Sequence, residues 1–517
     1  MPRHILLVVV DQFRADCVSG ALADAMPLPN LQALMADAVT FTRHYTVTTP
    51  CGPSRASLLT GLYAMNHRSI RNGTPLSAGH QTIGSLLRTT GFESMLFGYT
   101  DTSVDPRSVH FNDPALCNYE GLAAGFSERV SLCLETPGAW TGYLQAQGYQ
   151  APDNYWDWYK PRLDKSTATA QNPQGSPIRS PAIYSAQHSD TAYLADRTLE
   201  VWSGLAPQDQ FSLVTFIRPH PPLVAPSPYN SLVDPETLPL PTRAGSIESL
   251  QGQHALYKAS FSAPSGRGLY AGFDGDVQGL SERHIAELRA VYLGLAAEVD
   301  HHIGRLLDYL RRSGTLDETL VVVTADHGEL LGDHYLWGKL APFESALHVP
   351  LIIRDPDNTH MHGQCVSAFT ESVDIAPTLM EWAGGISVPA FDGHSLQPWL
   401  RGEKPGEWRS HVYAEAELGE PDTPTCYQQQ NSLHASQANF AMYRDAFYKY
   451  VHFNGGVEPL LFDLQNDPDE HMSLHDDPAC SAKRHELAVR LLEHRMTHAE
   501  HSLSNMKLTP DGLFTAC

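Results

Sequence analysis

The stretch Ile5-Leu-Leu-Val-Val-Val10, which runs directly into Asp11-Gln12, shows most clearly what fold this chain adopts. Its apolar residues follow one another without any polar alternation, so both faces of a strand built from them need to be buried. Such strands are typical of a parallel sheet that helices cover on both sides. Similar runs recur with helical patterns such as Leu31–Ala38 between them, at Ser94–Phe97, Phe211–Ile217, Leu320–Thr324 and Val349–Ile353. We therefore predict an α/β fold with a mostly parallel central sheet sandwiched by helices.

The longest helical pattern covers residues 281–312 and ends at Ser313-Gly314, which is a helix-stop signal. We expect this helix to pack on the sheet. Two stretches rich in proline, serine and other polar residues, Lys160–Pro181 and Pro219–Arg243, predict long inserted loops. Because long loops in compact domains often carry function, both are candidate lids.

The pattern changes after residue 404. The apolar runs become shorter and predict an antiparallel sheet, followed by a helix near Ser481–His494; they are His411–Glu415, Phe440–Tyr443, Tyr448–Phe453 and Leu460–Leu464. We therefore divide the chain into a catalytic α/β domain, residues 1–404, and a smaller C-terminal α+β domain, residues 405–517, that consists of this sheet, the helix and a tail.

The charge balance restricts the possible partners. The 517 residues include 35 basic and 58 acidic ones, a formal charge of −23, which argues against nucleic acid and against an anionic membrane. No run approaches the ~20 apolar residues of a membrane helix, and Ile5–Val10 is too short for a signal peptide. The eight cysteines are scattered without a Cys-x-x-Cys pair, as expected in a reducing compartment, so we predict a cytoplasmic protein.

Polar side chains follow two of the predicted strands directly. Asp11 and Gln12 follow the first strand, and Asp326 and His327 follow the strand at Leu320–Thr324. Alone, Asp11 could simply cap the next element, and a loop histidine is usually just solvated. In an α/β sheet, however, ligands bind beyond the carboxyl ends of the strands, and two such ends in one sheet predict a site for one divalent cation.

Two more residues are candidates for the same site. Lys339 follows Gly338 thirteen positions after Asp326. Lysines are usually surface residues, but this one is close in sequence to the metal loop and could bind an anion. His220 lies in Arg218-Pro-His-Pro-Pro, directly after a strand, where stiff prolines would fix an imidazole as a proton donor.

The segment Cys51-Gly-Pro53-Ser-Arg55 fits the C-x-P-x-R signature of sulfatases. With the strand-end residues, the chain resembles the phosphonate monoester hydrolase and arylsulfatase branch of the alkaline phosphatase superfamily, and the resemblance covers nearly all of the chain. It implies an alkaline-phosphatase-like fold. The further segments that carry it are Asp11-Gln12, Gly61–Arg68, Gly98-Tyr99-Thr100, Arg218–Pro222, Asp326–Glu329, Lys339, Tyr448–Phe453 and Phe462–Leu464.

The resemblance implies a modified nucleophile at residue 51. In this family a formylglycine-generating or sulfatase-maturating enzyme oxidises the cysteine to formylglycine, whose hydrate attacks the ester and later releases the acid. Pro53 would begin the helix and place Cys51 before its first turn, where backbone N–H groups favour an anion. Arg55 would stabilise the charged nucleophile. An unmodified Cys51 acting as a thiolate, with a lowered pKa at the helix N-terminus, is the alternative chemistry.

The resemblance also implies a metal site formed by Asp11, Gln12, Asp326 and His327 together with residue 51. Gln12 replaces the second aspartate that is usual in sulfatases, and His327 adds a nitrogen ligand. The resulting set is less anionic and softer than a calcium site, so we predict Mn, Fe or Zn rather than Ca.

Substrate contacts follow from matching positions. Asn72, Tyr99 and Lys339 match residues that bind the non-bridging oxygens, and His220 matches one near the leaving group. Asp101 departs from the pattern, because a threonine is expected there in phosphonate hydrolases. A carboxylate would repel an anionic substrate unless it is protonated, paired or turned toward the leaving group, so we expect Asp101 to influence the choice between sulfate and phosphonate.

The expected function is hydrolysis of a small anionic ester. We predict an arylsulfatase that cross-reacts with phosphonate monoesters and phosphodiesters; the alternative is a phosphonate monoester hydrolase and phosphodiesterase. A phosphatase or transferase with an unmodified nucleophile and an inactive binding protein are the competing classes. Family members form tetramers, and the tail from His498 to Cys517 is too short for its own core, so we expect a homo-tetramer.

Overall fold

The central element is an eight-stranded sheet in the order β10-β2-β9-β8-β1-β7-β5-β6. The computed structural model of the protein describes residues 2–162, 177–206, 208–262, 268–270, 273, 277–385, 391–500, 504, 506–510 and 512–515. β1 (His4–Val10) lies between β7 (Gln210–Phe216) and β8 (Thr319–Ala325) and is parallel to both. β5 (Glu93–Gly98) and β6 (Ser127–Ser131) continue the parallel part.

The other edge of the sheet is mixed. β9 (Leu351–Arg354) is antiparallel to β8 and to β2 (Val39–Phe41), and β10 (Cys365–Val366) is parallel to β2. The sheet is therefore mostly parallel, as predicted. The run at Val349–Ile353 forms a strand only from Leu351 onward.

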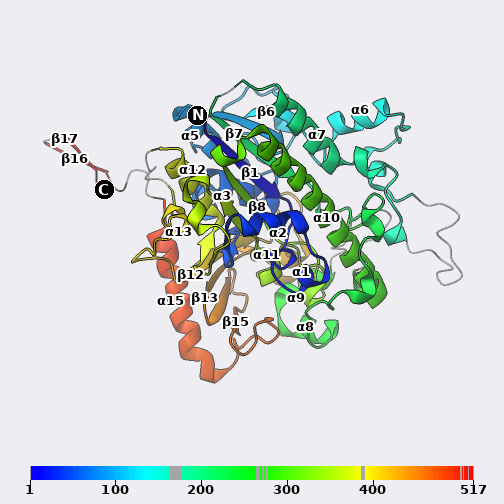
Figure 1. Ribbon diagram of the computed structural model, residues 1–517. Coiled ribbons are helices and arrows are strands. Elements are labelled where there is room, and N and C mark those ends of the chain that lie inside the picture. The colour runs from blue at the N-terminus through cyan, green and yellow to red at the C-terminus, as the bar shows by residue number, and fades with distance from the viewer. Residues whose placement is uncertain are drawn as a thin grey trace, which may run out of the picture.

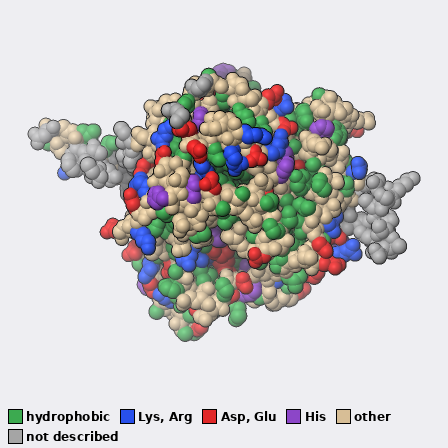
Figure 2. Space-filling model, viewed as in Figure 1, with side chains coloured by type: hydrophobic (Ala, Val, Ile, Leu, Met, Phe, Trp, Pro, Cys, Tyr) green, Lys and Arg blue, Asp and Glu red, His purple; other side chains and the backbone are tan. Residues whose placement is uncertain are grey.

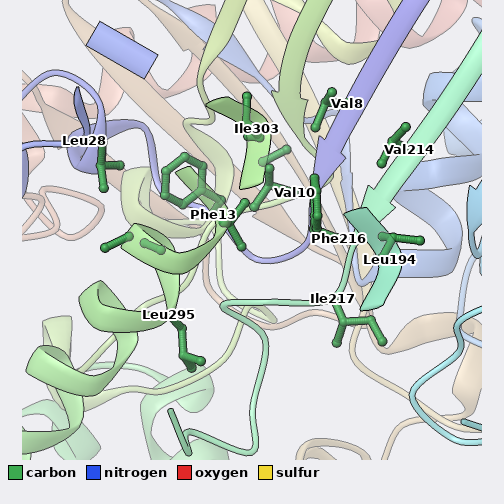
Figure 3. Packing of buried hydrophobic residues seen from close by; sticks show 14 of the residues in the cluster. Val8, Val10, Phe13, Leu28, Leu194, Val214, Phe216, Ile217, Leu295 and Ile303 are labelled. Carbon is green, nitrogen blue, oxygen red and sulfur yellow. The ribbon is translucent and has the colours of Figure 1, made fainter. Parts of the chain in front are cut away.

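Helices cover both faces of the sheet (Figure 1). Alternate residues of β1 face opposite layers: Val8 and Val10 belong to one buried apolar cluster, and Leu7 and Val9 to the other. Figure 3 shows Val8 and Val10 in the first cluster. The first layer contains α2 (Pro29–Ala36), α7 (Asp190–Ser203) and α10 (Glu282–Ser313), and the second contains α3 (Cys51–Thr60), α5 (Ile83–Thr89) and α12 (Ile375–Trp382).

The long helix α10 has the predicted boundaries. The Ser281 side chain accepts a hydrogen bond from the His284 N–H and caps the first turn. Gly314 ends the helix with a φ of 74°, which a glycine adopts without steric cost.

The C-terminal part contains a second sheet in the order β15-β14-β13-β12-β4. Four of its strands are antiparallel, namely β12 (His411–Glu417), β13 (Asn439–Asp445), β14 (Tyr448–Phe453) and β15 (Leu460–Asp463). The fifth, β4 (Thr48–Thr49), is parallel to β12 and ends just before Cys51. The small sheet therefore supports the segment that carries the expected nucleophile.

The helix α15 (Ser481–Thr497) packs against β13 and β14 and confirms the predicted C-terminal helix. A hairpin of β16 (Met506–Thr509) and β17 (Gly512–Thr515) lies apart from the body of the molecule in Figure 1. The remaining regular elements are α1 (Ala21–Ala25), β3 (His44–Tyr45), α4 (Ala64–His67), α6 (Gly138–Ala146), α8 (Ile247–Gln253), α9 (Ala255–Ser262), α11 (Glu344–Leu347), β11 (Thr370–Glu371), α13 (Gln397–Leu400) and α14 (Cys426–Asn431).

The two predicted loops differ in what the structure shows of them. Residues 219–243 contain only the short 3-10 turns Tyr229–Ser231 and Pro235–Thr237, which fits a loop. Much of the stretch from 160 to 181 lies outside the described residues. A lid function for either loop stays a prediction.

The surface charges, the helices and the cysteines bear on the predictions made from composition. Figure 2 shows acidic and basic side chains mixed over the face that it draws. Among the helices of the described ranges, none has both the length and the apolar character needed to cross a bilayer. The seven cysteines in the described part of the chain have free thiols.

Candidate active site

Four predicted residues converge at one edge of the central sheet. Val10 and Ala325 are register partners at the ends of β1 and β8, so Asp11 and Asp326 leave the sheet side by side. Cys51 reaches the same point from the first turn of α3. One ligand atom from each of Asp11, Cys51, Asp326 and His327 lies within 4.8 Å of the others, and all four residues are buried.

His327 is oriented as a metal ligand. Its Nδ1 lies 2.9 Å from the carbonyl oxygen of Gly328, so this nitrogen carries the proton and donates it. Nε2 therefore keeps a lone pair, and it lies 3.1 Å from the Cys51 Sγ and 3.8 Å from an oxygen of Asp326. Burial lowers the pKa of His327 to about 4, which keeps the ring neutral. A backbone acceptor that fixes the tautomer is common behind ligating histidines.

Arg55 lies behind the two carboxylates. Its Nε donates to Asp326 Oδ2 at 2.9 Å, and its Nη2 donates to Asp11 Oδ2 at 3.1 Å. The same Nη2 donates to the Tyr99 hydroxyl at 2.8 Å, and that hydroxyl in turn donates to Asp11. Arg55 thus occupies one oxygen of each carboxylate and leaves the Oδ1 atoms on the side of Cys51 and His327. The cation in contact with Cys51 is Lys339.

Cys51 is the first residue of α3, with Pro50 as its N-cap. The expectation that Pro53 begins the helix is wrong by two residues, because α3 begins at Cys51 and Pro53 is its third residue. The first intrahelical bond runs from the Ser54 N–H to the Pro50 carbonyl at 3.1 Å, so the missing N–H of Pro53 costs nothing. Burial, followed by the charge of Asp11, raises the pKa of the Cys51 thiol, which disfavours the thiolate alternative.

Lys339 connects Cys51 with Gln12. Its Nζ lies 3.1 Å from the Cys51 Sγ and donates to Gln12 Oε1 at 2.8 Å. Burial alone lowers the pKa of Lys339, but the neighbouring Cys51 and Asp11 outweigh it and raise that pKa. A positive charge is therefore held at the nucleophile position of an otherwise acidic protein.

Glu329 was not predicted as a site residue. It is the fourth residue of Asp326-His-Gly-Glu329, is 2% exposed and accepts a hydrogen bond from Gln12 Nε2. Its place next to a predicted metal ligand pair was the available signal. Gln12 itself has a φ of 61°, and its carbonyl oxygen accepts from the Tyr292 hydroxyl of α10 at 2.8 Å.

Asn72 and Asp101 lie beside the start of α3. Asn72 Oδ1 accepts from the Gly52 N–H at 2.9 Å. Asp101 has a φ of 51° and is 4% exposed, and its Oδ1 has no hydrogen-bond partner among the described residues. Burial raises the pKa of Asp101 to about 8, and the charges of Asp11 and Glu120 contribute. Its carboxyl group is therefore mostly neutral at pH 7.

His220 is held by the loop that carries it. Its Nδ1 donates to the Pro221 carbonyl at 2.6 Å, and Arg218 donates to the His220 and Pro222 carbonyls at 2.8 and 3.0 Å. Arg218 is itself fixed by Asp190 at 3.0 Å, a contact that the sequence analysis did not foresee. Burial and Lys339 lower the pKa of His220 well below 6.5, so the ring is neutral, and its expected role as a proton donor stays a prediction.

The donor set fits a divalent metal ion. One atom from each of two carboxylates and a neutral imidazole faces one point. The second oxygen of each carboxylate binds Arg55, and the other ring nitrogen of the imidazole donates to the Gly328 carbonyl. Oxygen and imidazole donors in this mixture suit Mn, Fe or Zn. Gln12 Oε1 accepts from Lys339 Nζ at 2.8 Å, and the same Nζ lies 3.1 Å from the Cys51 Sγ, so this amide oxygen lies beside the cluster.

The fold and the site define a class of protein. The sheet, the buried strand-end cluster and the nucleophile position at a helix N-terminus are those of a hydrolase with the alkaline-phosphatase-like fold. The chain belongs to the sulfatase family, because the Sulfatase family model matches residues 3–386. A second model, described as N-sulphoglucosamine sulphohydrolase, C-terminal, matches residues 332–497.

Similar proteins cover the whole chain. The phosphonate monoester hydrolase from Silicibacter pomeroyi is 44% identical with a TM-score of 0.93, and 99% of each chain is covered. The phosphonate monoester hydrolase of Agrobacterium radiobacter is 35% identical with a TM-score of 0.93 over 100% of both chains. The multifunctional alkaline phosphatase superfamily protein PehA of Trinickia caryophylli is 36% identical over 99% of each chain. The chain is thus a sulfatase-family hydrolase that is similar over its whole length to phosphonate monoester hydrolases.

Proposed function

We propose that this enzyme is a formylglycine-dependent metallohydrolase whose main substrates are phosphonate monoesters, with phosphodiesters and sulfate monoesters cleaved in the same site. The observation that carries the proposal is the position of Cys51, whose Sγ lies 3.1 Å from both His327 Nε2 and Lys339 Nζ at the start of α3. Oxidation of this residue to formylglycine by a maturation enzyme supplies a hydrated aldehyde as nucleophile.

Asp11, Gln12, Asp326 and His327 would hold the metal ion. When bound, the ion polarises the ester and favours an ionised nucleophile. Arg55 fixes the two carboxylates in the orientation that the ion needs. Lys339 holds a positive charge at residue 51, where it stabilises negative charge on the nucleophile and on the non-bridging oxygens.

The remaining contacts surround the substrate. Asn72 Oδ1 accepts a hydrogen bond from the Gly52 N–H, next to residue 51. The Tyr99 hydroxyl accepts a hydrogen bond from Arg55 and donates one to Asp11. His220 donates from Nδ1 to the Pro221 carbonyl, which leaves the lone pair on Nε2, and the charges of Lys339 and Asp326 act on this ring. We assign the Nε2 face of this ring to the leaving group.

Two observations favour phosphonates over the sulfate preference suggested by the sequence. The two phosphonate monoester hydrolases match the entire chain at 44% and 35% identity. In addition, burial keeps Asp101 mostly neutral, which removes the charge that first argued for altered selectivity. Sulfate monoesters remain the second candidate, because the family model is that of the sulfatases.

A comparison of kcat/KM for aryl phosphonate monoesters, aryl phosphodiesters and aryl sulfates tests this proposal. We expect activity on all three and the highest value for the phosphonate monoester. A highest value for the sulfate would support the second candidate. Inactivity of fully converted, metal-loaded enzyme on every one of them would contradict the proposed function.

We also propose a cytoplasmic homo-tetramer. The projecting hairpin supports association, because Leu508 on it is 84% exposed and an isolated two-stranded hairpin is marginally stable in water. The free thiols support a reducing compartment. A monomeric mass in light scattering at micromolar concentration would argue against the tetramer.

A further inference from the structure

Glu329 is a buried carboxylate on which three N–H donors converge. Its Oε1 accepts from the backbone N–H of Leu331 at 3.0 Å and from that of Gly338 at 2.6 Å, and its Oε2 accepts from Gln12 Nε2. Burial raises the pKa of Glu329, whereas these donors and Lys339 oppose that rise. The side chain is therefore fixed at both oxygens.

The contact with Glu329 determines which end of the Gln12 amide faces the reaction centre. An amide has a donor end and an acceptor end of nearly the same shape, so its partners decide its orientation. A carboxylate offers acceptors, and the NH₂ group of Gln12 therefore faces Glu329. The amide oxygen is left on the opposite side, where Lys339 Nζ donates to it at 2.8 Å.

Glu329 also holds the segment that carries Lys339. The Gly338 N–H that binds Glu329 is adjacent to Lys339 in the chain, and Lys339 Nζ lies 3.1 Å from the Cys51 Sγ. One carboxylate thus sets the orientation of Gln12 and the position of the lysine at the nucleophile.

We propose that Glu329 is a positioning residue that keeps the Gln12 amide oxygen directed toward Lys339 and the metal ion. This inference rests on the proposed function, in which Gln12 is a metal ligand. It predicts a requirement for complementary hydrogen bonding between positions 12 and 329, not merely for a side chain that fills the space.

The Glu329→Gln variant tests the requirement with almost no change in volume. The oxygen of Gln at position 329 is needed by the Leu331 and Gly338 N–H groups, so its NH₂ group faces Gln12. The Gln12 amide then turns its oxygen toward position 329 and its NH₂ group toward Lys339. We expect the affinity for Mn²⁺ to fall by about 10- to 100-fold, as is usual when a residue behind a metal ligand is lost.

The affinity is measured by titrating metal-free enzyme with Mn²⁺ and following free Mn²⁺ by electron paramagnetic resonance. Glu298→Gln is the matched control, because Glu298 is an equally buried glutamate on α10 whose oxygen accepts from Ser189 and orients no ligand. Its Mn²⁺ affinity is expected to equal that of the unchanged enzyme.

The swapped pair, a double variant with Gln12→Glu and Glu329→Gln, provides the decisive test. The NH₂ group at position 329 then donates to one oxygen of the new carboxylate, and the other oxygen again faces Lys339. We expect Mn²⁺ affinity to return to at least that of the unchanged enzyme, because position 12 again directs an oxygen toward the ion and now carries the negative charge. This variant also tests the inference if the single variant does not fold.

Two results would overturn the inference. One is unchanged Mn²⁺ affinity in folded Glu329→Gln, and the other is a folded swapped pair that binds as weakly as the single variant. Failure of the unchanged enzyme to bind Mn²⁺, Fe²⁺ or Zn²⁺ at all would instead contradict the proposed function. The two failures are therefore distinguishable without any activity measurement.

Discussion

Asp101 shows how a single buried carboxyl group controls the charge next to the nucleophile. It lies beside Gly52, is 4% exposed, and has an Oδ1 without a hydrogen-bond partner among the described residues. Since burial raises its pKa to about 8, the group is neutral at pH 6 and ionised at pH 9. Sulfate and phosphonate monoesters each carry one negative charge, so ionisation of Asp101 disfavours both.

Asp101→Thr is therefore expected to leave kcat/KM at pH 6 nearly unchanged and to raise it at pH 9. We expect a gain of about 10-fold for both ester classes, equivalent to about 1.4 kcal/mol in the transition state. Steady-state kinetics at the two pH values provide the measurement. An equal effect at pH 6 and pH 9 would show that the charge of Asp101 is not the cause.

The metal ligands lead to a prediction about metal content. Two carboxylates, an imidazole and an amide form a softer set than a calcium site. We expect purified enzyme to contain Mn, Fe or Zn, determined by elemental mass spectrometry. Removal of this metal with a chelator should abolish hydrolysis, and its return should restore it. Stoichiometric calcium with no first-row metal would contradict this prediction.

At the scale of single residues, much of the site could be predicted because it follows strand ends and a short signature. Asp11, Asp326, His327 and Cys51 come together within 4.8 Å. Glu329 was missed because its importance depends on the rotamer of Gln12, which no local pattern encodes. The lowered pKa of His220 could not be predicted from the sequence, since the burial of this residue and the nearby charge of Lys339 arise only on folding.

Among the elements, α10 carries an unusual buried group. Glu298 is 0% exposed, its Oε1 accepts from the Ser189 hydroxyl, and its Oε2 has no partner among the described residues. Burial raises the pKa of Glu298 from 4.5 to about 8. The folded state thus binds more protons than the unfolded state between these values, so stability falls as the pH rises through this window.

Glu298→Gln should remove this dependence. Below pH 4.5 the variant and the unchanged enzyme should be similarly stable, and above pH 8 the variant should be more stable by roughly 3 to 5 kcal/mol. Thermal unfolding of both proteins from pH 4.5 to pH 9 measures the difference. A parallel decline of both melting temperatures with rising pH would refute the assignment to Glu298.

Elements with strong periodicity or clear caps were predictable, as α10 and the parallel strands show. The antiparallel direction of β9 was not predicted, because strand direction depends on the path of the chain and not on local composition. The pairing of β4 with β12 was not predicted either, since a two-residue strand has no periodic signal.

At the scale of the whole molecule, an ion cluster around Lys449 joins the C-terminal sheet to α11 of the catalytic part. Lys449 on β14 is fully buried, and its Nζ lies 2.8 Å from a carboxylate oxygen of Glu344. Glu344 is the first residue of α11, five positions after Lys339. Lys449 also contacts Glu470 and donates to the Pro342 carbonyl at 3.1 Å. The division of the chain at residue 404 stays a prediction, because β4 and this cluster tie the C-terminal sheet to the catalytic part.

Lys449→Met leaves the buried Glu470 without its cation and removes the nearer cation from Glu344, which keeps the longer contact with Arg444 Nε at 3.4 Å. We expect a loss of stability of roughly 3 to 5 kcal/mol, which denaturant unfolding measures. Lys483→Met, which removes a surface pair with Glu486, is the control and should change stability by less than about 1 kcal/mol. Equal effects of the two substitutions would mean that the cluster does not hold the parts together.

The central claim is that residue 51 acts as formylglycine and not as a cysteine. Mass spectrometry of the peptide around residue 51, from enzyme of full hydrolytic activity, tests it most directly. We predict a peptide in which the thiol of residue 51 has been replaced by an aldehyde that reacts with hydrazine reagents. An intact thiol in fully active enzyme would contradict it.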